Sequence, residues 1–270
     1  MRKYDVKKII EKWYKKLNFP SKYDSEFYNA LNDIKIEDVN IRQEDITEKD
    51  GNKNFLLFLY LCEELSEKYG QKGISEEILL DTLADLGSWL DIWSELKGGL
   101  YLGEVAWLRN HISMNLFKLG RLQFAFGKAE SDVPEKNIKK GDNVIEVHIP
   151  WGGALIKEEC ERSFEKAIKF FKEFYPEYEY KCFTCHSWLM DETLKKLLKP
   201  ESNILLFQNM FEVFNPEESY NILKYVFKWD ATKESINSYV ATSTFAKRVQ
   251  EWVNDGKMFY ESLGVIEIDN

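Results

Sequence analysis

Residues 143–167 constrain the fold most, because their pattern changes from strand to turn to helix over a short distance. From 144 to 149, an apolar set of side chains alternates with a mixed set that includes Glu146 and His148. This is the period of a strand with two unlike faces. Pro150 ends the strand, because proline has no N–H for a β-ladder.

A glycine turn and a helix are predicted next. Trp151-Gly152-Gly153 forms a turn in which backbone can approach a ligand closely. Apolar residues then recur at helical spacing: Cys160, Phe164, Ala167, Ile168, Phe171 and Phe174. Such a unit often holds phosphate, because the free N–H groups at the helix start point outward. The spacing by itself favours an ordinary strand–turn–helix unit and leaves the phosphate site open.

The part of the chain before Leu119 has helical periodicity. Apolar residues recur three and four positions apart, and Ser75 is a predicted helix cap. Gly70 is a predicted helix stop, and 33–52 reads as a polar loop. The predicted helices are 4–17, 24–31, 55–69, 75–97 and 105–119.

The periodicity changes at Gly120 to that of strands. The predicted strands are 122–126, 144–149, 178–188, 204–214 and 265–268, and helices are expected near 191–199, from Asn215 and over 246–254. The sequence therefore predicts an α+β chain with a helical domain at 1–118 and a mixed α/β sheet domain at 119–270.

An ordered series of motifs carries a resemblance to a known family. VHIP, GGAL, ECERSFEKAIKFF, CHSWLM and SNILLFQNMFEVF together resemble the GNAT-like C-terminal domain of predicted acyl-CoA N-acyltransferases. The resemblance covers 120–264 well and the first part of the chain more loosely. It implies an N-terminal helical domain and a GNAT-like sheet in which a second strand splays from the first.

The resemblance also implies a cofactor site in this splay. Acetyl-CoA or another acyl-CoA would lie there as co-substrate, with its pyrophosphate at the glycine turn. The implied cofactor-binding residues are Ile149, Trp151, Gly152, Gly153, Ala154 and Lys157. The commoner GNAT pattern has Arg or Gln before a Gly-x-Gly or Gly-x-Ala turn, whereas Trp151 stands before the two glycines here.

Glu146 and His148 are the candidate catalytic residues, because they share one face of the strand expected to border the thioester. An ammonium cannot attack a thioester, so a base that accepts the amine proton is needed, and histidine suits this near neutral pH. A core histidine and a solvated glutamate are the structural alternative. Candidate substrate residues are His186 and Ser187 on the splayed strand and Gln208 and Glu212 on the next strand.

Two features oppose catalysis. The helix expected near 191–199 contains no tyrosine, the usual GNAT general acid. Glu158, Glu159 and Glu161 stabilise the start of the helix after the turn, but the same charges repel a pyrophosphate, and Lys157 only partly offsets them.

The cysteines fit neither a metal site nor a disulfide framework. Cys182 and Cys185, followed by His186, match a C-x-x-C-H pattern, but no second Cys or His cluster completes a zinc site. Cys185 and His186 point to opposite faces of a strand, so a nucleophile–base pair is disfavoured. Small buried cysteines are the simpler interpretation.

The net charge of −9 disfavours nucleic acid and anionic membranes, which need a basic surface. A charged N-terminus without an apolar signal region predicts a reduced, cytoplasmic protein. The first hypothesis is an N-acyltransferase acting on a small-molecule or peptide amine without a metal. The alternative is a non-catalytic GNAT-like module that binds an acyl or nucleotide ligand or a protein partner. A cysteine-dependent transferase or hydrolase is a distant third.

Overall fold

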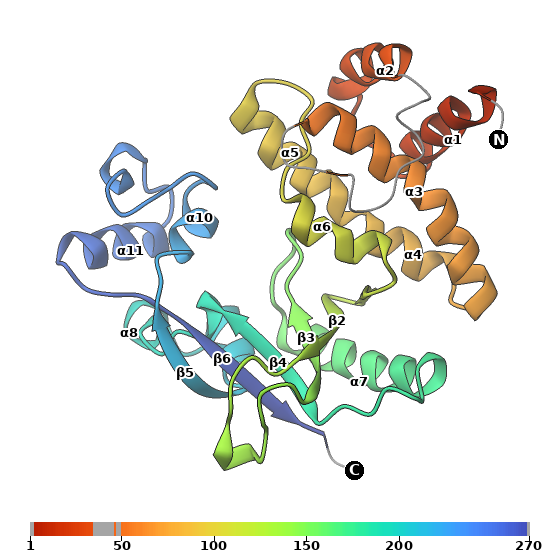
Figure 1. The fold of residues 1–270 in the computed structure, drawn as a ribbon. Coiled ribbons are helices and arrows are strands. Elements are labelled where there is room, and N and C mark those ends of the chain that lie inside the picture. Colours follow the sequence, from red (N-terminus) through yellow and green to blue (C-terminus); the bar gives the residue numbers. More distant parts are fainter. Residues whose placement is uncertain (1–2, 35–45, 47–49, 269–270) are drawn as a thin grey trace. The chain divides into compact units, whose positions relative to one another are not determined.

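The computed structural model describes residues 3–34, 46 and 50–268 (Figure 1). The chain divides into two compact units, Met1–Lys118 and Leu119–Asn270. Helices make up the first unit apart from the start of one strand, and the second contains a mixed sheet with helices. The predicted α+β fold class, a helical part followed by a GNAT-like mixed sheet, is confirmed.

The helical unit is organised around one long, buried helix. Its helices are α1 (Lys3–Lys16), α2 (Asp24–Asp33), α3 (Gly51–Lys72), α4 (Glu76–Leu83), α5 (Asp85–Lys97) and α6 (Val105–Ile112). α3 contacts α1, α2, α4 and α6. Its first half is apolar nearly all round, so Phe55 and Phe58 are fully buried. Tyr14 of α1 stacks on Phe27 of α2 at 3.7 Å between ring centroids.

Two predicted helix boundaries in this unit are wrong. Gly70 lies inside α3, and the helix ends at Gly73, which has the left-handed φ of 79° that favours glycine. A glycine inside a helix costs only about 1 kcal/mol relative to alanine, so the surrounding apolar pattern prevails. The predicted single helix 75–97 is two helices that meet at Ala84. Ser75 caps α4 as predicted, accepting a hydrogen bond from the Ile78 N–H at 3.4 Å.

The helix predicted over 105–119 is also wrong at its end. α6 stops at Ile112, Met114 adopts a φ of 56°, and β1 (Leu116–Leu119) follows. Leu116 and Leu119 fit a helical spacing equally well, because a short apolar run does not distinguish helix from strand. The loop predicted at 33–52 lies largely outside the described residues.

The sheet has the strand order β1-β2-β3-β4-β6-β5 (Figure 1). The strands after β1 are β2 (Leu122–Lys128), β3 (Asn143–His148), β4 (Cys182–Ser187), β5 (Glu212–Glu218) and β6 (Tyr260–Glu267). β3 and β4 run parallel, whereas β2–β3, β4–β6 and β5–β6 are antiparallel. The strand predicted at 265–268 is thus the end of the longer β6.

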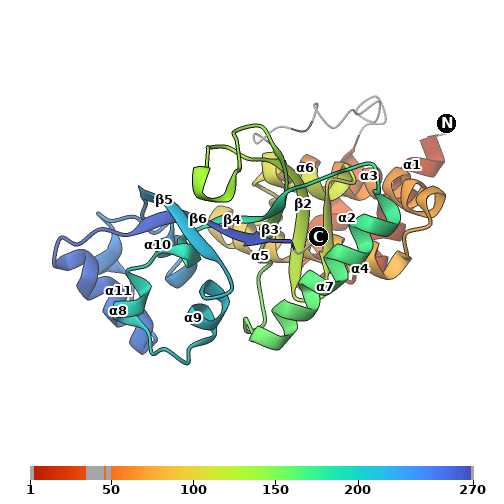
Figure 2. The same ribbon diagram turned by 90° about the horizontal axis from the view of Figure 1, so that it is seen from below.

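One face of β2, β3 and β4 packs on α7 (Lys157–Phe174), which runs beside β2 (Figure 2). Phe164 of α7 lies 5.6 Å from Phe124 and 5.1 Å from Phe183, and Phe171 lies 5.3 Å from Phe126. These aromatic contacts fix which side chains point to α7. The opposite face therefore carries the intervening residues of each strand.

A second core lies beside β5 and β6, and Figure 2 labels the helices that contribute to it. It contains α8 (Leu194–Leu197), α9 (Asn203–Gln208), α10 (Ile222–Val226) and α11 (Thr244–Asn254). Leu194, Leu223, Val249 and Phe259 are fully buried in this core.

Two predictions in this region are wrong. The strand expected at 204–214 is α9 followed by the start of β5, because Ser202 caps a helix by accepting from the Leu205 N–H. The helix expected from Asn215 is the middle of β5. Asn215 and Pro216 fit there because β5 is an edge strand with a register shift between Phe214 and Glu217. Across the described part of the chain, no helix is long and apolar enough to cross a membrane.

Candidate functional site

The parallel strands β3 and β4 separate at their carboxyl ends. Their register pairs Ile145 with Phe183 and Glu146 with Thr184, and goes no further. β3 nevertheless continues to His148 and β4 to Ser187. The two strands therefore splay beyond Glu146. The side chains of Glu146 and His148 lie on the sheet face opposite α7.

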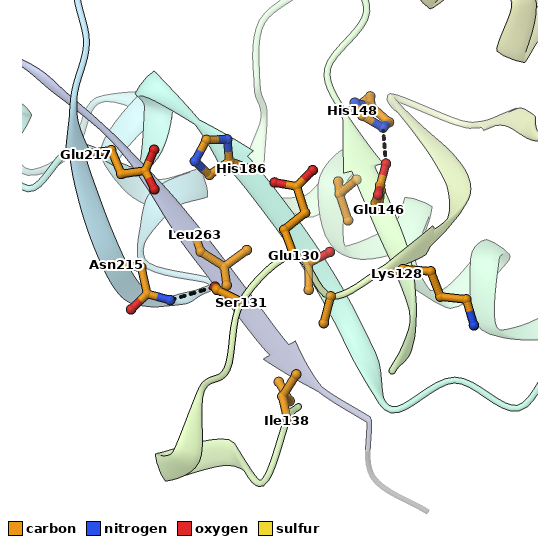
Figure 3. A pocket seen from close by; sticks show the side chains of 13 residues that line it. Lys128, Glu130, Ser131, Ile138, Glu146, His148, His186, Asn215, Glu217 and Leu263 are labelled. Carbon is orange, nitrogen blue, oxygen red and sulfur yellow. Dashed lines mark hydrogen bonds and ion pairs between the residues drawn. The ribbon is translucent and has the colours of Figure 1, made fainter. Parts of the chain in front are cut away.

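A cavity of about 410 Å³ opens at this splay (Figure 3). It is bounded by the two strands, by the connection that follows β2, and by β5. The residues that line it are Lys128, Ala129, Glu130, Ser131, Ile138, Glu146, Val147, His148, Thr184, His186, Asn215, Glu217 and Leu263. Three of the sequence-predicted residues, Glu146, His148 and His186, thus come together around one cavity.

Glu146 and His148 form a pair. His148 Nε2 lies 3.4 Å from Glu146 Oε2 (Figure 3), and the two side chains are 30% and 38% exposed, respectively. A carboxylate in this place stabilises an imidazolium that forms when the histidine accepts a proton. Both side chains line the cavity.

Gly127 makes room for Glu146. A Cβ atom on Gly127 would lie 2.3 Å from Glu146 Oε1, closer than real contacts allow. The Gly127 carbonyl accepts a hydrogen bond from the Tyr178 hydroxyl at 2.8 Å, which holds the backbone at this point. The absence of a side chain at 127 therefore sets where the carboxylate lies. The sequence analysis placed Gly127 just after the predicted strand 122–126 and gave it no role.

Arg121, which the sequence analysis did not single out, holds the glycine turn by hydrogen bonds to its backbone carbonyls. Its guanidinium donates to the carbonyls of Pro150, Gly153 and Ala154 at 3.2, 3.0 and 3.0 Å. Burial lowers the pKa of Arg121, but a guanidinium stays charged in proteins. No local pattern pointed to this role, because the contact joins the turn before β2 to the turn after β3.

The turn leaves its N–H groups open. Gly152 and Gly153 have φ values of 81° and 72°, which glycine adopts without strain. Within the described residues, the N–H groups of 152–158 have no hydrogen-bond acceptor. The helix does not follow the glycines directly: Ala154, Leu155 and Ile156 lie between them and α7. These donors and the positive end of α7 suit an anion.

The start of α7 also carries acidic residues. Lys157 Nζ lies 3.4 Å from Glu161 Oε1, while Glu158 and Glu159 occupy the first turn. The carboxylates lower the positive potential that the helix start offers to an anion. Arg121, Arg162 and Lys166 line a smaller cavity next to this helix and add positive charge.

Four aromatic residues gather where β3 and β4 end. Trp151, which is 36% exposed, stacks on Tyr225 of α10 with ring centroids 5.3 Å apart. Trp188, which follows β4, lies 5.7 Å from Tyr225, and Trp229 lies 5.6 Å from it. This cluster places an apolar surface beside the glycine turn. Ile149, also predicted at the site, is half-buried between His148 and Pro150.

The remaining predicted substrate residues lie outside the cavity lining. Ser187 accepts a hydrogen bond from the Leu189 N–H, at 3.2 Å. Gln208 is buried in α9 and donates to the carbonyls of Leu189 and Asp191, both at 2.9 Å. Glu212 is exposed on β5 and pairs with Lys136 at 2.5 Å. The prediction that Gln208 and Glu212 share one strand face is wrong, because Gln208 is helical.

The cysteines are buried and free. Burial raises the pKa of Cys160 and of Cys182 to about 11, and that of Cys185 to about 12, so none is a ready thiolate. His186 lines the cavity while its neighbour Cys185 is buried on the other face of β4. Among the residues with described positions, no three His, Cys, Asp or Glu side chains form a possible metal site.

Comparison with family models matches both parts of the chain. A model described as the N-acyltransferase N-terminal domain matches residues 2–114. A model described as the GNAT-like C-terminal domain matches residues 116–266, which is more than half of the chain. No curated protein gives a significant match.

Solved acyltransferase structures have the same fold. One, in complex with decanoyl-CoA, has 27% sequence identity and a TM-score of 0.70, and the match covers 79% of this chain but only 65% of that one. A mutant acyltransferase with octanoyl-CoA has 20% identity and a TM-score of 0.80, covering 96% and 87% of the two chains. Another, with decanoyl-CoA and teicoplanin, has 19% identity, a TM-score of 0.76 and the same coverage. At such identities the last two show the fold alone.

Proposed function

Because the chain belongs to the family that joins an N-acyltransferase N-terminal domain to a GNAT-like C-terminal domain, we propose that it transfers an acyl group from acyl-CoA to an amine. The observation that carries this proposal is the splay of β3 and β4. The Glu146–His148 pair lies on one side of the splay, and a turn with free N–H groups follows the same strand. A base and an anion site are thus presented by one strand.

The acyl-CoA pyrophosphate binds at the glycine turn in this proposal. The open N–H groups of 152–158 and the positive end of α7 supply its donors. The cofactor residues are Ile149, Trp151, Gly152, Gly153, Ala154 and Lys157. Arg121 acts by holding the carbonyls away from the ligand. Octanoyl-CoA and decanoyl-CoA, which bind the similar structures, suggest a medium-length acyl chain, and the aromatic cluster offers it an apolar surface.

The chemistry is a direct attack without a covalent enzyme intermediate. His148, assisted by Glu146, takes a proton from the amine, and the nitrogen lone pair forms a bond to the thioester carbonyl carbon. The C–S bond then breaks, and the CoA thiolate takes a proton. Tyr225 is a candidate donor, because its ring contacts both Trp151 and Trp188 at the ends of the splayed strands. It would replace the tyrosine missing near 191–199.

Thermal-shift measurements with CoA, acetyl-CoA, octanoyl-CoA and decanoyl-CoA test the donor site. A ligand that binds only the folded state raises the melting temperature by mass action. Release of the CoA thiol with a panel of amines then tests turnover. Binding without turnover on any amine would favour the non-catalytic module. No binding of any CoA compound would refute the donor site altogether.

A further inference from the structure

The cavity at the splay carries an excess of negative charge. Glu130, Glu146 and Glu217 line it, against one lysine, Lys128. The Lys128 ammonium bonds Asn143 Oδ1 at 2.5 Å and points away from the three carboxylates (Figure 3). The two histidines of the lining add positive charge only when protonated. A ligand of this cavity therefore meets acidic groups from three directions: the connection after β2, β3 itself, and β5.

Two of these carboxylates are not used by the fold. Within the described residues, the carboxylates of Glu130 and Glu217 make no hydrogen bond or ion pair. Glu217 also stands directly across from Glu261 in the β5–β6 register, and like charges in that position destabilise a sheet. The Glu261 carboxylate accepts hydrogen bonds from the Ser219 hydroxyl and the Asn221 amide. Glu217 thus keeps an unfavourable position without a compensating contact in the protein.

Thr184 supplies a polar group to the lining of the cavity from β4. Thr184 is only 6% exposed, lines the cavity, and pairs with Glu146 across the β3–β4 register. Its hydroxyl makes no hydrogen bond to any described residue. The hydroxyl oxygen itself is open to the cavity, so it is available to a polar group of a ligand there.

We propose that the acceptor carries at least two amino groups, one that reacts and one that stays as an ammonium. This inference rests on the proposed acyl-transfer function. The reacting amine loses its proton to His148, while the second remains protonated between Glu130 and Glu217. An acceptor with a carboxylate in place of the second amine would meet the same groups with like charge. The substrate class is therefore a di- or polyamine or an amine-rich sugar.

A charge series of acceptors tests this. 1,5-Diaminopentane, 5-amino-1-pentanol and 5-aminopentanoate share one reacting amine and differ in the charge at the other end, and spermidine extends the series. With a saturating acyl-CoA, kcat/KM is expected to fall in the order cationic, neutral, anionic. The cationic acceptor should exceed the neutral one by about tenfold, and added salt should reduce that advantage.

Charge-removing variants locate the effect. Glu130→Gln and Glu217→Gln should each lower kcat/KM for 1,5-diaminopentane by about threefold, as for a single exposed ion pair, and leave 5-amino-1-pentanol unchanged. Glu218→Gln, next on β5 but outside the lining, is the matched control. Equal rates for the three acceptors, or no effect of either variant, would overturn the inference and leave acyl transfer standing.

If the protein turns over no amine, a binding experiment tests the cationic ligand instead. Calorimetric titration of spermidine into the protein with CoA present should then show affinity that the double variant Glu130→Gln/Glu217→Gln lacks. That result would refute the transferase but keep the cationic ligand, and no binding would refute both.

Discussion

At the residue scale, we propose different roles for Glu146 and His148. They lie two positions apart on β3, so they share a face, and the 3.4 Å contact joins their charges. Histidine is the residue that most often serves as a general base. We therefore assign proton acceptance to His148 and stabilisation of its charged form to Glu146.

His148→Gln is expected to lower kcat by about a hundredfold or more, which is an ordinary size for loss of a general base. The affinity for CoA should hardly change, because the imidazole acts on the amine. The pH dependence of the rate should also differ between wild type and variant, because the variant lacks one ionisable group of the site. Glu146→Gln should cause a smaller loss, since histidine remains.

The reverse order of effects would make Glu146 the base. Steady-state thiol release across pH, with one amine and one acyl-CoA, measures both variants. Full activity in both would remove the pair from the chemistry.

Gly127→Ala is expected to act through Glu146. The new Cβ would fall 2.3 Å from Glu146 Oε1, so the carboxylate must move away from His148. We expect kcat to fall by about tenfold, which corresponds to roughly 1.4 kcal/mol of transition-state stabilisation. In a Glu146→Ala background, which removes the clash, Gly127→Ala should have no further effect.

Gly70→Ala is the matched control, because nothing lies within 4 Å of a Cβ at that helical position. Equal losses from Gly127→Ala with and without the Glu146 side chain would mean that the alanine disturbs the strand itself.

At the scale of elements, the glycine turn depends on a residue far from it in sequence. Three carbonyls of 150–154 accept hydrogen bonds from the Arg121 guanidinium. Arginine presents several donors in a rigid plane, which a lysine ammonium does not. The orientation of the peptide groups at the proposed pyrophosphate site is therefore set by the turn before β2.

Arg121→Lys and Arg121→Gln are expected to raise KM for acyl-CoA by about tenfold, because charge-assisted hydrogen bonds each contribute roughly 1.5–3 kcal/mol and part of the loss falls on the turn. The kcat value should change little. Arg162→Gln removes one positive charge from the same small cavity without a turn contact and serves as the control. An equal rise of KM in the Arg162 variant would attribute the effect to charge. An unchanged KM in the Arg121 variants would exclude a role for the hydrogen bonds from Arg121 to the turn.

The sequence predicted β3, the glycine turn and α7 because their patterns are local. A strand period, a proline and a helical period follow one another, and the structure keeps them in that order. It did not predict α9 and β5, because an apolar run such as 203–214 fits helix and strand alike. The helix predicted from Asn215 was wrong for a related reason, because Pro216 suits a helix start and an edge strand equally.

The cavity was predicted only in part for a different reason. Glu146, His148 and His186 lie on strands whose faces can be read from alternation. Glu130 and Glu217 come from a loop and an edge strand, and only tertiary structure brings them to the same place. The roles of Thr184 and Gly127 depend on Glu146 of the neighbouring strand β3, and no single stretch of sequence contains that relation.

At the scale of the whole molecule, the residues proposed to act lie in one unit. All fall within Leu119–Asn270, the unit that contains the GNAT-like match. We propose that the two units are separate domains, 1–118 and 119–270. The donor and acceptor sites then belong to the second domain.

The net charge of −9 predicts opposite salt responses for the two substrates. Acyl-CoA is anionic, so its approach to an acidic protein is opposed, and screening within a Debye length of about 8–10 Å at 0.1–0.15 M salt relieves that repulsion. An ammonium acceptor is attracted by the same field. Raising the salt concentration should therefore increase kcat/KM for acyl-CoA by about twofold and decrease kcat/KM for the amine.

Each kcat/KM value is measured with the other substrate saturating, and an unchanged melting temperature serves as control. A decrease for acyl-CoA would show that Arg121, Arg162 and Lys166 beside α7 outweigh the charge of the whole chain at the donor site.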